Sequence, residues 1–176
     1  EVAATDISKG NPDAKLTLIE YSDFQCPACR AQHRSIRKIW PQIKGSVNFV
    51  YRHFPLSNIH PHAITAAYYA EAAAKQDKFW EMHDIFFDRQ GQWASTKEIK
   101  PVFDGYVAEL KLDKDQFDKD VASDEVRDKV ASDIQSAKKA HAASTPTLFL
   151  NGKLLRDVRE ADKLRAVIRQ AIKDAG

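Results

Sequence analysis

Two short apolar segments near the start of the chain have the pattern of buried strands. Leu16–Tyr21 is rich in β-favouring residues and follows the turn signal at residues 11–13. Val47–Tyr51 has the same character and follows Gly45-Ser46. Short β-favouring runs bounded by turn residues are typical of strands, and the apolar character of the first run predicts burial in the interior.

A helix is predicted between these two strands. Pro27 suits a first helical position, where a missing N–H costs little. The helix is expected to end at Trp40, because Pro41 disfavours helical geometry in the residue before it. The chain therefore begins as β-α-β, with Cys26-Pro27-Ala28-Cys29 in the turn from strand to helix.

The stretch of residues 60–141 is predicted to be helical. Residues 99–110 place apolar side chains at helical spacing, and Ser95 and Glu98 have the spacing of a capping box for that helix. The alternating charges of residues 111–129 indicate a solvated helix face. The other apolar helical positions are Ala63–Ala74, Phe79, Met82, Phe86, Val126, Val130 and Ile134.

The strand pattern returns after residue 142. Thr147–Leu150 is apolar, Asn151-Gly152 is a strong hairpin signal, and Lys153–Leu155 is the expected return strand. Apolar positions at helical spacing in residues 161–171 predict a closing helix. The order β-α-β, helices, β-β-α is that of an α/β domain interrupted by a helical insertion.

Three parts of the chain follow from this order. We expect residues 1–59 to form the first part of the α/β domain, residues 60–141 the inserted helical domain, and residues 142–176 the second part. The hydrophobic fraction of 43% and charged fraction of 30% are ordinary for a globular protein. The formal net charge of +2 gives no nucleic-acid signature, and no apolar run has the length needed to cross a bilayer.

The two cysteines are the most informative residues. As a redox dithiol, Cys26 would lie at the helix N-terminus, where N–H groups and the helix dipole favour a thiolate. Cys29, one turn later, would then resolve a mixed disulfide. The alternatives are half of a zinc site or two inert core thiols. Because the only close histidine pair, His60 and His62, matches no common zinc spacing, we favour the dithiol and predict no metal site.

Three further polar side chains lie near the cysteines in the sequence. Glu20 ends an apolar strand, and burying an acid there costs free energy unless the acid has a function. It can take the proton from Cys29. The alternative is a carboxylate that reaches water at the end of the strand. Arg30 lies on the same helix face as Cys26 and is expected to favour its thiolate, or else to face solvent. His33, a further turn along, is interpreted as an ordinary surface histidine.

Ser144-Thr145-Pro146-Thr147 opens the late strand. Proline is tolerated at the first residue of a strand, and most X-Pro bonds are trans. A cis bond would instead present the backbone of Thr145 to an extended peptide beside the cysteines. This segment is therefore the second candidate for substrate contact.

Four segments, in this order, resemble the DsbA-like thioredoxin-fold oxidoreductases. The segments that carry the resemblance are Leu18–Cys29, Tyr51–Leu56, Lys78–His83 and Ser144–Lys153. The likeness extends from about Asn11 to the C-terminus. It implies a thioredoxin fold, in which a central mixed sheet is flanked by helices and interrupted by an inserted helical domain.

The resemblance also implies a role for each matched residue. Cys26 matches the exposed nucleophile and Cys29 the buried resolving thiol. Glu20 matches the buried acid, Pro146 matches the cis-proline, and Thr145 matches the residue that shapes substrate contact.

The implied function is thiol:disulfide exchange with reduced or unfolded exported proteins, promoting disulfide formation. A membrane redox partner would reoxidise the pair, in the bacterial periplasm after removal of a signal peptide, and we expect a monomer without a cofactor or nucleic-acid partner. The active-site helix starts with Pro27-Ala28, whereas strong oxidants of the family carry Pro-His. The direction therefore stays open: the alternatives are a reductase or isomerase, or a metal-binding or chaperone-like module of the same fold.

Overall fold

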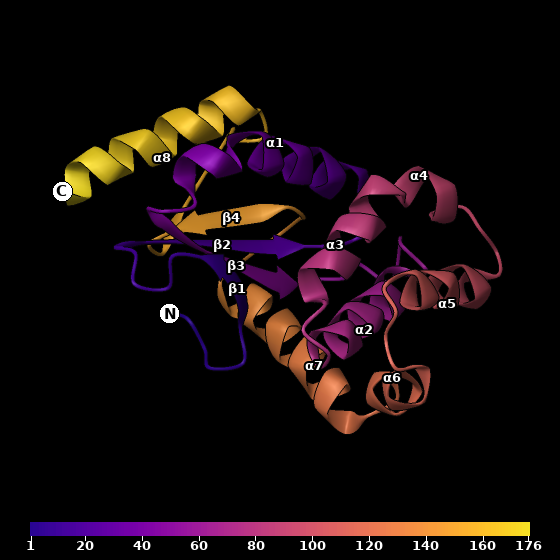
Figure 1. Ribbon diagram of the computed structural model, residues 1–176. Coiled ribbons are helices and arrows are strands. Elements are labelled where there is room, and N and C mark those ends of the chain that lie inside the picture. Colours follow the sequence, from indigo (N-terminus) through magenta and orange to yellow (C-terminus); the bar gives the residue numbers. More distant parts are fainter.

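The computed structural model describes residues 1–176 and is built on one mixed five-stranded sheet (Figure 1). The strand order is β1-β3-β2-β4-β5, with β2 and β3 parallel and the other neighbours antiparallel. This is the mixed sheet that the resemblance implied. The strands are β1 (Ile7–Gly10), β2 (Leu16–Ser22), β3 (Val47–His53), β4 (Thr147–Leu150) and β5 (Lys153–Leu154).

Helices cover both faces of the sheet and form a separate group beside it. They are α1 (Pro27–Ile43), α2 (Ala63–Ala74), α3 (Phe79–Asp88), α4 (Gln90–Trp93), α5 (Ile99–Glu109), α6 (Lys114–Val121), α7 (Asp124–Lys139) and α8 (Ala161–Ala175). Figure 1 shows α1 and α8 on one face of the sheet, α7 on the other, and α2 to α6 beside it. None of these helices combines the length and the apolar character needed to cross a membrane.

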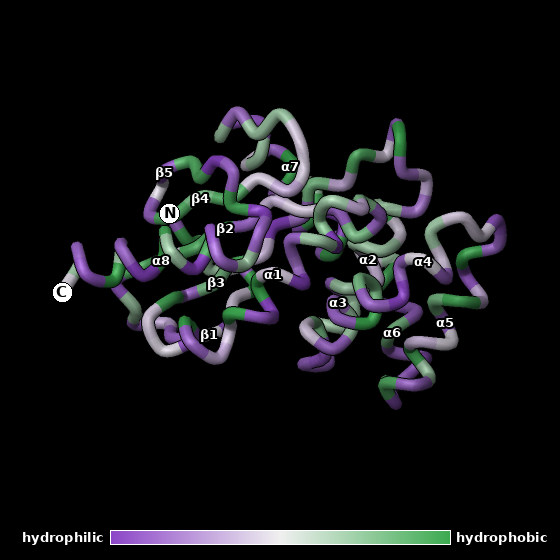
Figure 2. The backbone as a smooth tube through the Cα atoms, turned by 90° about the horizontal axis from the view of Figure 1, so that it is seen from above, coloured by the Kyte–Doolittle hydropathy of each residue, from purple (hydrophilic) through white to green (hydrophobic).

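The central strands are buried because helices cover both faces. Every residue of β3 is buried, and all but one residue of β2. One apolar core joins the sheet to α1 and α8 and contains Leu18, Ile39 and Ile168. Along α8 hydrophobic and hydrophilic positions alternate (Figure 2), as expected for a helix with one buried face. A second core lies in the helical group and includes both cysteines.

The predicted hairpin is present. Asn151 and Gly152 both have positive φ, 46° and 79°, the conformation that a two-residue hairpin turn requires. The Asn151 side chain also ties this turn to β2, because its Oδ1 accepts from the Thr17 N–H and its Nδ2 donates to the Lys15 carbonyl. The hairpin therefore fixes the end of β4 that lies away from Pro146.

Three local expectations were wrong. Strand β1 was not predicted; it pairs with β3 and ends at Gly10, where a Cβ would lie 2.3 Å from the Val47 carbonyl oxygen. Pro41 lies inside the last turn of α1, which continues to bury Ile43. Ser95 caps no helix, since α5 begins after Glu98 and makes no side-chain cap.

The division of the chain at residues 59 and 141 stays a prediction. Helix α7 belongs by sequence to residues 60–141, yet its Ala137 packs on the sheet with Ile19, Tyr21 and Val50. The last of the inserted helices thus supports the face of the sheet opposite α1.

Candidate functional site

Cys26 lies at the N-cap of α1, directly before Pro27. Cys26 is 7% exposed, whereas Cys29 is fully buried, so Cys26 is the more accessible of the two residues. Both cysteines are free thiols. The backbone N–H groups of Ala28 and Cys29 point toward the Cys26 sulfur because the first N–H groups of a helix have no partner within it.

These surroundings stabilise the thiolate of Cys26. The pKa of Cys26 is lowered from 9.0 to about 5, chiefly by the Cys29 thiol, which donates to the Cys26 sulfur, and further by Thr145 and by the two backbone N–H groups. Burial opposes this effect without cancelling it. The pKa of Cys29 is raised well above its ordinary value by burial and by its bond to Cys26. One thiol is therefore prepared to react and the other to hold its proton.

The loop before β4 approaches this pair. The Thr145–Pro146 peptide bond is cis, as the resemblance implied, and the Cys26 Sγ lies 3.6 Å from the Thr145 carbonyl oxygen. Thr145 is buried. Two segments 119 residues apart in sequence thus meet at the reactive sulfur.

Glu20 lies in the middle of the sheet, between Tyr51 of β3 and Leu148 of β4. Its side chain is 1% exposed and its Oε1 has no hydrogen-bond partner. Burial raises the pKa of Glu20 from 4.5 to about 8, and the charge of Lys9 opposes this rise. A negative charge on Glu20 raises the pKa of Cys29. The two groups are therefore close enough for the ionisation of one to affect that of the other.

Glu20 lines a cavity of about 250 Å³ on the side of the sheet that carries α1. Lys9 lies over the rings of Trp80 and Trp40, at 4.3 Å and 5.0 Å from their centroids. The wall also contains His33 of α1 and the neighbours His83 and Asp84 of α3. The buried acid therefore faces a polar cavity and not a closed apolar core.

Asp23 holds the turn before Cys26 in place. Its carboxylate accepts from the backbone N–H of Gln25 at 2.8 Å and of Leu56 at 2.9 Å, and it lies 2.7 Å from His60 Nδ1. His62 instead contacts the Thr96 carbonyl. The two histidines considered for a zinc site are thus engaged separately and not with the cysteines.

Gln90 of α4 ties the helical group to the active-site turn. Its side-chain amide donates to the carbonyls of Phe24 and Cys26, at 2.7 Å and 3.0 Å. The Gln25 amide likewise donates to the Ala94 carbonyl. Sequence reasoning missed Gln90, because no local pattern signals a contact between residues 64 positions apart.

Two expectations about α1 need correction. Arg30 points its guanidinium toward the Asp88 carbonyl, 3.5 Å away. The groups that lower the pKa of Cys26 are Cys29, Thr145 and the helix N–H groups. His33 is not a surface residue: it is 5% exposed, because α3 packs over this face of α1.

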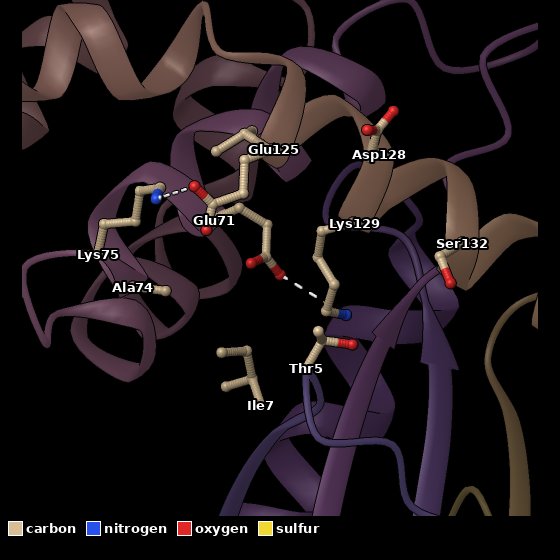
Figure 3. Close-up of a pocket in the computed structure, with 10 residues that line it drawn as sticks. Thr5, Ile7, Glu71, Ala74, Lys75, Glu125, Asp128, Lys129 and Ser132 are labelled. Atoms are coloured by element: carbon tan, nitrogen blue, oxygen red, sulfur yellow. Dashed lines mark hydrogen bonds and ion pairs between the residues drawn. The ribbon is translucent and has the colours of Figure 1, made fainter.

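A further cavity, of about 660 Å³, lies between α2, α7 and the N-terminal segment (Figure 3). None of the residues predicted for the site lines it. Four of its charged side chains form pairs, Lys75 with Glu125 at 2.6 Å and Lys129 with Glu71 at 4.0 Å. The dithiol and the Glu20 cavity therefore remain the candidate site.

Known proteins share this chain's sequence pattern. Residues 3–170 match the sequence profile of the family described as Thioredoxin. The chain belongs to this thioredoxin family. It is also 34% identical over 170 residues to the Na(+)/H(+) antiporter NhaA 3 of Salinispora tropica, covering 97% of this chain and 25% of that protein.

A second relative also matches this chain over only part of its own length. The Na(+)/H(+) antiporter NhaA 1 of Mycolicibacterium gilvum is 38% identical over 163 residues, which cover 90% of this chain and 25% of the antiporter. The chain thus spans about a quarter of the length of the curated relatives that it matches.

Solved structures share the whole fold of this thioredoxin-family chain. Alpha-DsbA1 of Wolbachia pipientis superposes with a TM-score of 0.87 at 22% identity, covering 99% of this chain and 94% of that one. BdbD of Bacillus subtilis gives 0.79 at 22% identity, covering 96% and 93%. The thiol-disulfide exchange protein alpha-DsbA2 of Wolbachia pipientis gives 0.81 at 16% identity, covering 96% and 88%. The inserted helices are therefore part of a fold found in DsbA-type proteins.

Proposed function

We propose that this chain is a thiol:disulfide oxidoreductase that passes a Cys26–Cys29 disulfide to other proteins. The observation that carries the proposal is the contrast between the two thiols. The pKa of Cys26 is lowered to about 5 and that of Cys29 is raised. Such a contrast suits a pair in which one sulfur reacts with substrates and the other closes or opens the disulfide.

The exchange proceeds in two displacements. A substrate thiolate attacks the Cys26 sulfur of the disulfide, which forms a mixed disulfide and releases Cys29 as a thiolate. A second substrate thiolate then attacks the substrate sulfur of the mixed disulfide, and Cys26 leaves as a thiolate. The substrate loses two electrons, and the cysteine pair gains them and becomes the dithiol. The lowered pKa makes Cys26 a good leaving group.

Glu20 supplies the proton that this sequence requires. Cys29 leaves as a thiolate in a buried place that disfavours charge, and a carboxylic acid with a pKa of about 8 is still protonated at neutral pH. In the opposite direction, when Cys29 attacks, the Glu20 carboxylate takes its proton. The cavity beside Glu20 offers a route for exchange with solvent.

Pro146 and Thr145 form the substrate contact in this proposal. Thr145 places its backbone beside Cys26, where an extended segment can pair with the main chain with little regard to side chains. Next to Pro146 lies a cavity of about 430 Å³ with charged residues on its wall, among them Asp157, Arg159 and Lys163. The surface suits polar, unfolded segments.

The same proposal names the setting. The clients are reduced or unfolded exported proteins, a membrane redox partner restores the disulfide, and the location is the bacterial periplasm. The fold shared with DsbA-type proteins supports this. Reduction or isomerisation uses the same atoms, and the reduction potential decides between the directions.

Disulfide transfer tests the proposal. The oxidised protein is mixed with a reduced, unfolded test protein, and thiols are counted on both partners. We expect two thiols to appear here for each disulfide formed there. In a second arm the test protein carries its disulfides: the Cys26 thiolate of Cys29→Ser should attack one of them, displace a test-protein thiolate and accumulate as a mixed disulfide, and the matched Cys26→Ser variant should accumulate none. Equal trapping by both variants, or no transfer by the parent protein, would contradict the proposal.

A further inference from the structure

His33, His83 and Asp84 bring three metal-binding atoms together. His33 comes from α1, and the other two are neighbours on α3. Their ligand atoms lie within 4.8 Å of one another. The Asp84 Oδ1 is 2.8 Å from His83 Nδ1 and 3.9 Å from His33 Nε2. Because the histidines are fifty positions apart, no sequence motif announces the group.

The Nε2 atom of His33 is buried and has no hydrogen-bond partner. A buried polar atom without a partner is costly and calls for an explanation. Packing fixes the ring, which stacks on Phe87 at 5.0 Å and 21° and meets His83 edge to face at 5.0 Å. The nitrogen is therefore held facing the aspartates of α3, too far away for a hydrogen bond.

The spacing of these atoms suits ligands of one ion. Zinc bonds to nitrogen and oxygen are close to 2.1 Å, so tetrahedral ligands lie about 3.4 Å from one another. His33 Nε2 is 3.9 Å from Asp84 Oδ1 and 3.7 Å from Asp88 Oδ1. His83 Nδ1 and Asp84 Oδ1, 2.8 Å apart, would have to separate slightly, and the two His33 distances would have to shorten. Small side-chain rotations would bring these atoms within bonding distance of a common ion.

The two aspartates divide their oxygens between His33 and Arg37. Both Oδ1 atoms face His33, whereas the Oδ2 atoms of Asp84 and Asp88 lie 3.8 Å and 2.8 Å from the Arg37 guanidinium. Arg37 thus holds the carboxylates from the outer side. On the inner side Asp84 Oδ1 is hydrogen-bonded to His83 Nδ1, and a metal ion bound there would replace the proton of that bond. The cavity of about 250 Å³ includes His33, His83 and Asp84 in its wall, and the Asp84 side chain is 43% exposed, which gives an ion access.

The other buried group of this kind differs. His53, Glu71 and Asp133 also place their ligand atoms within 4.8 Å. Lys129, however, already lies 2.6 Å from Asp133 and 4.0 Å from Glu71, and Figure 3 shows it pointing toward Glu71. The Lys129 ammonium group contacts both carboxylate oxygens of Asp133 and so occupies the place of a cation there.

We propose that His33, His83 and Asp84 bind a divalent transition-metal ion, with Asp88 available as a fourth ligand. Zn²⁺ readily binds two imidazoles and a carboxylate. Ca²⁺ and Mg²⁺ prefer sites made of oxygen ligands and suit this set poorly. The site lies in the wall of the cavity that ends at Glu20 and uses neither cysteine.

Metal titration tests this assignment in a Cys26→Ser Cys29→Ser background, where thiols cannot bind the metal and disulfide exchange has no influence. Zn²⁺ is titrated by calorimetry, and Co²⁺ by the visible absorption of the bound ion. We expect one ion per chain. His33→Gln and Asp84→Ala each remove a ligand and should weaken metal binding by more than about tenfold. Removing a residue that only hydrogen-bonds to a ligand already costs at least about tenfold in metal affinity.

Two matched variants separate this site from others. His141→Gln removes an exposed histidine and should leave the affinity unchanged. His53→Gln tests the second buried group and should also leave it unchanged. Asp84 is at the surface, so its variant keeps the test decisive if His33→Gln folds poorly. Absence of saturable binding, an affinity that Asp84→Ala does not alter, or a loss confined to His53→Gln would overturn the proposal.

Discussion

Replacing Glu20 by glutamine keeps the shape of the side chain and removes its charge from the protein interior. Glu20 is 1% exposed, its Oε1 has no partner, and burial raises its pKa from 4.5 to about 8. Because the pKa is higher in the folded state, the folded state holds a proton that the unfolded state releases. Stability must therefore fall as the pH rises through this interval.

The size of the stability change follows from the difference between the folded and unfolded pKa values of Glu20. Each pH unit between the two pKa values costs about 1.4 kcal/mol, and pH 7 lies roughly two and a half units above the unfolded value of 4.5. We therefore expect Glu20→Gln to stabilise the protein by up to about 3 kcal/mol at pH 7 and by almost nothing near pH 4. Full burial means that solvent screens little of this cost.

Urea denaturation from pH 4 to pH 8 measures the difference. It is best made in the Cys26→Ser Cys29→Ser background, because Cys26 titrates in the same range with the opposite sign. Glu98→Gln is the matched control, since Glu98 is exposed and forms no ion pair. A Glu20→Gln curve that runs parallel to the parent curve across this range would refute the reasoning.

Three further predictions concern the dithiol. Alkylation of Cys26 should show a midpoint near pH 5, and Cys29→Ala should raise it because a hydrogen-bond donor is lost; an unchanged midpoint would contradict this. The free energy of unfolding of the reduced protein, relative to that of the oxidised protein, should grow between pH 5 and pH 8. The lowered pKa of Cys26 contributes stability to the reduced form that is lost as the pH falls through about 5. A difference between the two redox forms that does not change with pH would be evidence against this. Gln90→Ala should cost about 1–3 kcal/mol in unfolding free energy, because the buried Phe24 carbonyl loses its partner and the Cys26 carbonyl keeps only the Arg30 N–H, and exposed Gln92→Ala should cost almost nothing.

The central strands and the hairpin were predictable because their signals are local. Continuous apolar residues predict a strand covered on both faces, and Asn151-Gly152 has the conformation that its residues favour. Strand β1 gives no such signal: it has one strongly apolar residue, Ile7, and forms through pairing with β3. The predicted helix end before Pro41 was wrong because the burial of Ile39 and Ile43 outweighs one missing hydrogen bond near the end of a helix.

The candidate site divides in the same way. The cysteines are visible in the sequence through their spacing at a strand-to-helix turn, and Glu20 is visible because it interrupts an otherwise apolar strand. The contacts of Gln90 and the burial of His33 depend on how α3 and α4 pack against the turn and α1. Such contacts join residues far apart in the chain, and neither spacing nor periodicity reports them.

The reduction potential of the Cys26–Cys29 pair tests the central claim most directly. Stabilising the Cys26 thiolate stabilises the reduced form, and a pKa of about 5 lies between those of thioredoxin, near 7, and DsbA, near 3.5. Equilibration with glutathione buffers should therefore give a potential more positive than about −200 mV, the range of a disulfide donor. A value at or below about −270 mV, that of the reductant thioredoxin, would contradict the account.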